Sequence, residues 1–82
     1  MARYRRKSPK KLGSKMREIR LRLGMTQEEL ARHLGTDSGS ISRFENSKRD
    51  PSLLEILEFS RYCGVGIELL IDDKQNLGKK WH

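Results

Sequence analysis

Apolar residues recur along the first third of the chain at the spacing of a helix. They follow one another at intervals of four, three and four residues, at Leu12, Met16, Ile19 and Leu23. This spacing places them on one face of an amphipathic helix. Ser8 and Pro9 suit the N-cap and first turn of such a helix, and Gly24 suits its C-terminal end. The pattern therefore predicts a first helix that begins near Pro9.

Two shorter amphipathic segments follow. Thr26 and Glu29 have the residue types and spacing of a capping box, and the segment that they begin has the inward residues Leu30, Ala31 and Leu34. Gly35 ends this segment. Asp37 is a good N-cap for the next one, residues 37–45, which buries Ile41 and Phe44. We therefore expect two short helices joined by a tight turn.

The second half of the chain predicts one longer and one shorter helix. Ser52 caps the longer one, whose expected inward residues are Leu53, Ile56, Leu57, Ser60 and Cys63. A turn at residues 64–66 precedes a last short helix over residues 67–71. No segment has a strand pattern, so we expect an all-α protein. We divide it into a basic flexible arm (1–8), one domain (9–71) and a flexible basic tail (72–82).

Charge is distributed unevenly along the 82 residues. The formal net charge is +7, but residues 12–73 hold nine basic and eleven acidic side chains. Residues 1–11 hold six cationic side chains and no acidic one, and residues 74–82 add three lysines. Basic ends of this kind are typical of polyanion binding, and they also occur as extensions that only keep a protein soluble.

Other sequence features narrow the class of protein. The single cysteine, Cys63, excludes an internal disulfide and suits a reducing compartment. The sequence has no apolar run of membrane-spanning length and no signal-peptide pattern, so we expect a cytoplasmic protein that makes no membrane contact. His33 is predicted to face outward, and no zinc spacing or nucleotide-binding motif is present. We therefore expect no enzymatic activity, no cofactor and no metal.

The segments at residues 26–34 and 37–45 have the layout of a helix-turn-helix. In that motif the second helix enters the major groove of DNA and the first crosses the backbone. An ordinary helical hairpin would show the same pattern of apolar residues.

Several short motifs then occur in order: Gly24-Met25-Thr26-Gln27-Glu28-Glu29-Leu30-Ala31, Ile41-Ser42-Arg43-Phe44-Glu45-Asn46, Pro51-Ser52-Leu53 and Cys63-Gly64-Val65. Together they resemble the phage repressor and Cro family, often called Xre-like, over about residues 9–71. The resemblance implies a compact five-helix, lambda-repressor-like DNA-binding domain.

The resemblance also implies roles for residues near the groove. It places base-reading side chains at Ser38, Gly39, Ser42 and Arg43, among which Arg43 can donate two hydrogen bonds to a guanine. A surface salt bridge is the alternative role for Arg43. Phosphate contacts are implied for Gln27, Asn46, Lys48 and Arg49, although Gln27 could simply fill a solvated first turn. Arg20 and Glu45 match a partly buried ion pair, which is a structural role.

We therefore expect a regulator of transcription, and a repressor, that binds specific double-stranded DNA as a homodimer. Two alternatives stay open. An antitoxin-like or adaptor module would chiefly bind a protein partner, and a nonspecific nucleic-acid binder would use the basic ends. Apolar residues expected at the surface offer a possible dimer or partner surface, namely Leu54, Tyr62 and Leu69.

Overall fold

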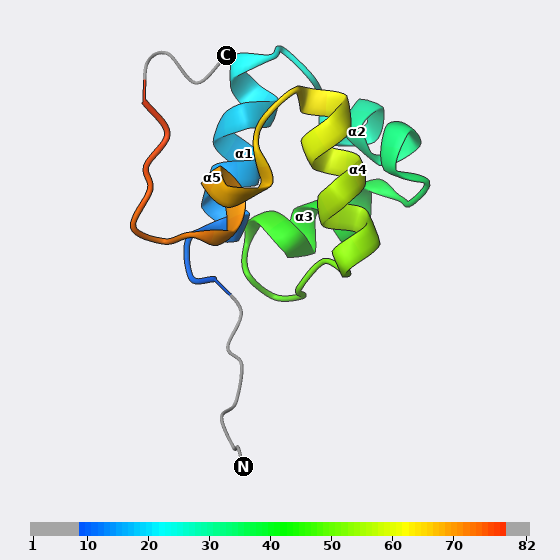
Figure 1. The fold of residues 1–82 in the computed structure, drawn as a ribbon. Helices are drawn as coiled ribbons and strands as arrows, with labels where there is room; N and C mark the ends of the chain where they lie inside the picture. The colour runs from blue at the N-terminus through cyan, green and yellow to red at the C-terminus, as the bar shows by residue number, and fades with distance from the viewer. Residues whose placement is uncertain (1–8, 79–82) are drawn as a thin grey trace.

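The computed structural model describes residues 9–78, which form five α-helices and no strand (Figure 1). Their bounds are α1 Leu12–Arg22, α2 Gln27–Leu34, α3 Ser38–Glu45, α4 Leu53–Cys63 and α5 Ile67–Ile71. The predicted arm at residues 1–8 and residues 79–82 of the predicted tail lie outside the described part. None of the five helices is long and apolar enough to cross a membrane.

Hydrogen bonds to side chains fix the starts of the middle helices, as the sequence predicts. The backbone N–H of Glu29 donates to Thr26 Oγ1 at 3.0 Å, and the Thr26 N–H donates to Glu29 Oε1 at 2.8 Å. Ser52 and Glu55 form the same capping box on α4. Asp37 caps α3 by accepting from the Ser40 N–H at 2.7 Å. Each cap satisfies a backbone donor that the helix itself leaves without a partner.

One core joins all five helices. Its largest fully buried side chains come from α1, α2, α3, α4 and α5, namely Met16, Ile19, Leu30, Ile41, Phe44, Phe59 and Leu70. Two expectations about this core are wrong. Leu53 was expected inside but is 69% exposed, and Leu23, the last residue of the predicted stripe, is 40% exposed. The inward face of α4 centres on Cys63, as expected, and on Phe59, which was not among the expected inward residues and lies four residues before it.

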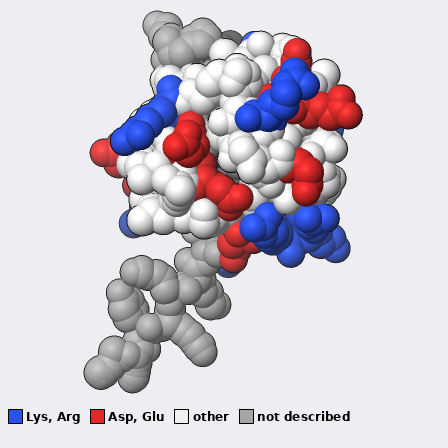
Figure 2. Space-filling view, turned by 90° about the vertical axis from the view of Figure 1, so that its right-hand side faces the viewer, with Lys and Arg blue, Asp and Glu red and all other residues white. Residues whose placement is uncertain are grey.

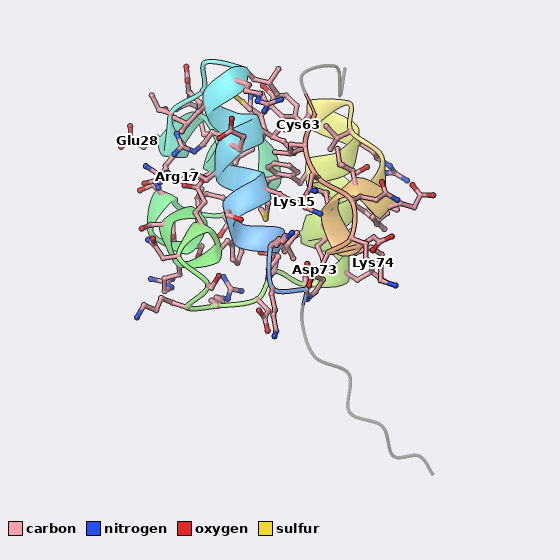
Figure 3. All side chains as sticks on the ribbon, turned by 90° about the vertical axis from the view of Figure 1, so that its left-hand side faces the viewer. Lys15, Arg17, Glu28, Cys63, Asp73 and Lys74 are labelled. Atoms are coloured by element: carbon pink, nitrogen blue, oxygen red, sulfur yellow. The ribbon has the colours of Figure 1, made fainter. Side chains whose placement is uncertain are left out.

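The start of α1 also differs from the sequence prediction. The helix begins at Leu12, and its cap residue Lys11 provides no capping side chain. The cap comes from a residue that is distant in the sequence. The Asp73 carboxylate accepts from the backbone N–H groups of Lys10 and Lys11 at 2.9 and 3.0 Å and so caps α1. These hydrogen bonds hold the pKa of Asp73 below its usual value. Figure 3 shows Asp73 beside the first turn of α1.

The segment of residues 72–78 runs back along α1 (Figure 1), whereas the sequence suggested a flexible tail there. The buried Lys15 ammonium donates to the carbonyls of Leu69 and Asp72 at 2.6 and 2.9 Å. Burial lowers the pKa of Lys15, and the nearby Asp73 charge opposes that shift. Leu77 packs against the core. These contacts lead us to extend the proposed domain from residue 71 to residue 78.

Gly13 allows α1 to approach the C-terminal end of α3 closely. A Cβ atom at this position would lie 2.3 Å from the Phe44 carbonyl oxygen and 3.1 Å from that of Glu45. Such a contact is too short for any side chain, so the backbones of the two helices meet here directly. This contact fixes where α3 ends relative to α1.

Candidate nucleic-acid interface

The two helices of the predicted helix-turn-helix, α2 and α3, pack against each other across a tight turn. Gly35 makes the turn in the left-handed conformation, with φ +69°. Ile41 and Phe44 fix one side of α3 in the core, as predicted. The opposite side carries the residues that we expected to read bases, Ser38, Gly39, Ser42 and Arg43, and their spacing places them on one surface of the helix. Whether they read bases stays a prediction.

Arg43 and Arg49 share a hydrogen-bond acceptor. The guanidinium groups of Arg43 and Arg49 donate to Ser40 Oγ at 3.2 and 3.1 Å. Ser40 is itself buried, and the Arg49 guanidinium lies 5.0 Å from the centre of the Phe44 ring. This geometry brings two positive charges together around Ser40, in the N-terminal half of α3. Arg49 also lies 4.0 Å from the Glu55 carboxylate, so it is held more firmly by the fold than Arg43.

Gly39 lies close to two charged side chains of the site. A Cβ at this position would lie 3.5 Å from a guanidinium nitrogen of Arg43 and 3.3 Å from Asp37 Oδ1. The Arg43 guanidinium therefore rests over the first turn of α3. Hydrogen bonds from Ser40 lower the pKa of Asp37, and the charges of Arg43 and Arg49 lower it further. An ionised Asp37 thus reduces the repulsion between the two arginines.

The predicted ion pair between Arg20 and Glu45 is present and buried. Arg20 Nε and one of its terminal nitrogens donate to the two Glu45 carboxylate oxygens at 2.7 and 3.0 Å. A third donor of Arg20 reaches the Met25 carbonyl at 2.9 Å. The Gln27 amide also donates to Glu45, at 3.1 Å. Glu45 therefore ties α1 and the first residue of α2 to the last turn of α3.

The remaining predicted phosphate ligands occupy the end of α3 and the loop after it. The Asn46 amide donates to the Ser42 carbonyl at 2.9 Å and so caps the end of α3. Ser47 adopts the left-handed conformation, with φ +59°, and turns the chain away from the helix. Lys48 follows at the surface, and its ammonium has no hydrogen bond or ion pair within residues 9–78. Lys48 is therefore free to bind an anion.

Ser40, Gly13 and the Gln27–Glu45 contact were absent from the predicted site. Ser40 lies three residues before Arg43, so the sequence did contain a spacing that favours this contact. The other two depend on how α1, α2 and α3 approach one another. The sequence pattern of a single helix does not predict how closely that helix packs against another.

The predicted dimer or partner surface is only partly exposed. Leu54 and Tyr62 are 65% and 45% exposed on α4, and the Tyr62 ring stacks on His33 with centroids 3.9 Å apart. Leu69, in contrast, packs against the core. Figure 2 views the molecule from the right-hand side of Figure 1 and shows Lys and Arg side chains mixed with Asp and Glu. This side is therefore not a continuous basic face.

Chemistry of other kinds has little basis in the described residues. No group of three or more His, Cys, Asp or Glu side chains among residues 9–78 could hold a metal ion. Burial raises the pKa of the Cys63 thiol to about 11, so the thiol stays protonated at neutral pH. Cys63 is a small core residue here.

The sequence matches the helix-turn-helix family over residues 16–70. It is similar to an uncharacterised helix-turn-helix transcriptional regulator of Archaeoglobus fulgidus, with 37% identity over 68 residues that cover 80% of this chain and 97% of the relative. It is also similar to the transcriptional regulator ImmR of Bacillus subtilis, with 32% identity. That match covers 84% of this chain and 54% of ImmR, so the chain spans about half of that protein.

The fold is similar to that of a solved repressor. The P22 c2 repressor, in a crystal structure with a synthetic operator, superposes with a TM-score of 0.72 and 24% sequence identity. The superposition covers 76% of this chain and 94% of the repressor chain. At this identity the comparison shows the shared fold.

Proposed function

This chain belongs to the helix-turn-helix family of DNA-binding transcriptional regulators, and on that premise we propose that it represses transcription by reading a specific operator with α3. One observation carries the proposal. The exposed side of α3 presents Arg43 from a helix whose other side is fixed by the core and by the Glu45 contacts. A rigid helix with an exposed arginine suits direct readout in the major groove. Such a regulator would work in the cytoplasm.

Phosphate contacts on both sides of α3 would orient it in the groove. Gln27 keeps a second amide N–H for a phosphate, because Glu45 takes only one. It lies at the N-terminus of α2, where the helix dipole favours an anion. Lys48 and Asn46 would bind the backbone after α3. Arg49 would add positive charge near the same phosphates while it remains packed on Phe44.

Replacing Arg43 by alanine should remove most of the base discrimination. We expect a loss of about 1–3 kcal/mol on the best operator, which is about fivefold to 150-fold in Kd, and relaxed preference at one position, a guanine. Fluorescence anisotropy titrations of the selected operator and its single-base variants would measure both effects. Arg61→Ala, which removes an exposed arginine from α4, is the matched control. An equal loss of affinity on every sequence would mean that Arg43 contacts the DNA phosphate backbone and not a base.

The exposed apolar residues of α4 support a homodimer on DNA. One recognition helix of eight residues makes few base contacts, so a second copy would raise both affinity and specificity. Leu54 and Tyr62 would form part of the contact between copies. The same residues favour the second candidate function, an adaptor or antitoxin-like module that binds another protein. If these residues form the contact between copies, Leu54→Glu should abolish cooperative operator binding. If they bind another protein instead, the variant should bind DNA as the wild type does.

A further inference from the structure

Three arginines of α1 differ in how the fold uses them. Arg20 is buried against Glu45, and Arg22 donates to Glu18 at 3.0 Å and to the Gly78 carbonyl. Arg17 is exposed, and its guanidinium has no hydrogen bond or ion pair within residues 9–78. No polar contact of the described structure therefore requires an arginine at position 17.

The position of Arg17 on α1 is informative. Gly13, Arg17 and Arg20 are four and three residues apart, so they lie on one face of the helix. Gly13 meets the carbonyl oxygens at the end of α3, and Arg20 reaches Glu45 and the Met25 carbonyl before α2. Arg17 lies between these two contacts. It is therefore next to the junction of α1 with the end of α3 and the start of α2.

The same junction holds a proposed phosphate ligand. Gln27 reaches Glu45 from the start of α2, and Glu45 is neutralised by Arg20. Figure 3 shows Arg17 and Glu28 on the side of the molecule where α2 and α3 lie, whereas Lys15 and Lys74 lie toward α5. A duplex that contacts Gln27 and the exposed side of α3 would pass the guanidinium of Arg17.

We propose that Arg17 binds a DNA phosphate and so extends the backbone contacts of the domain from α2 and α3 onto α1. The inference rests on the proposed DNA-binding function. An arginine suits this role because its planar guanidinium can donate two hydrogen bonds to one phosphate, and because no competing carboxylate holds it in the described structure.

Arg17→Ala should flatten the salt dependence of DNA binding. Neutralising one phosphate contributes about 0.9 to the slope of log affinity against log salt, so the variant should lose about 0.9. The factor by which Arg17→Ala loses affinity should therefore be about eight times larger at 0.1 M salt than at 1 M salt. It should be equal on the operator and on random duplex DNA. The thermal unfolding midpoint should match that of the wild type, because the exposed guanidinium makes no hydrogen bond or ion pair within residues 9–78.

Two further variants control for charge. Arg17→Lys keeps a cation and should retain most of the slope, whereas Lys74→Ala removes one positive charge on the α5 side and should change the slope little. If the wild type binds DNA and the salt slopes of Arg17→Ala and Lys74→Ala are equal, the inference is wrong. The proposed function would then remain intact. A wild-type chain that binds no duplex would overturn both.

Single neutral methylphosphonate substitutions in the operator would identify the phosphate. One substitution should weaken the wild type by about as much as Arg17→Ala does, and it should have no further effect on that variant. If every neutral phosphate weakens the wild type and Arg17→Ala equally, Arg17 contacts none of them and the inference is wrong.

Discussion

Replacing Glu45 by alanine should lower the free energy of unfolding by about 3–5 kcal/mol, because it leaves the Arg20 guanidinium charged and without its partner in the interior. The side chains of Arg20 and Glu45 are 9% and 2% exposed, and two hydrogen bonds join them. The substitution also removes the acceptor of the Gln27 amide. Urea denaturation followed by far-ultraviolet circular dichroism would measure the loss.

The double variant Arg20→Met with Glu45→Met tests whether the buried charge is the cause. Replacing both members of a buried pair by apolar residues removes the unpaired charge and often restores stability. We therefore expect the double variant to be more stable than Glu45→Ala. A Glu45→Ala protein within about 1 kcal/mol of the wild type would show that water reaches Arg20, and that the pair does not hold the three helices together.

Deleting residues 1–8 should produce the largest change in DNA affinity. This segment lies outside the described residues, and its sequence holds four cations, Arg3, Arg5, Arg6 and Lys7. If the basic arm lies along the duplex, three or four phosphate contacts add about 3 to the salt slope per protomer. The factor by which the deletion weakens binding should then be about 1,000 times larger at 0.1 M salt than at 1 M salt. The preferred sequence should stay the same.

The deletion stops at residue 8 for a structural reason. Lys10 and Lys11 donate their backbone N–H groups to Asp73, so removing them would also damage the start of α1. Replacing Lys79 and Lys80 by glutamine provides a control in the other basic end. A slope that changes by less than about one unit after the deletion would mean that the arm stays in solvent.

Helix boundaries set by neighbouring residues were predictable from the sequence. The caps at Thr26, Asp37 and Ser52 bond to backbone groups three residues away, so their pattern is visible in a short stretch of chain. The start of α1 was not predictable in this way. Its cap, Asp73, is 62 residues from Lys11, and only the folded chain brings the two together.

The register of α4 shows a different limit. From the sequence, Leu53 was expected in the inward stripe and Phe59 outside it, but Phe59 is buried and Leu53 is exposed. An apolar stripe wider than the available core leaves some of its members outside. The same limit applies to the site. The resemblance to a known family predicted the Arg20–Glu45 pair, but the sharing of Ser40 by Arg43 and Arg49 depends on how the loop after α3 folds back.

Selection of bound duplexes from a random DNA pool tests the central claim most directly. We expect enrichment of a near-palindrome whose half-sites lie about 10–10.5 base pairs apart, as two copies reading successive turns of the major groove require. Repeating the selection with Arg43→Ala should retain the spacing and lose one guanine in each half-site. A pool with no enriched sequence, or with a single asymmetric half-site at saturation, would contradict a dimeric regulator that reads its operator with α3.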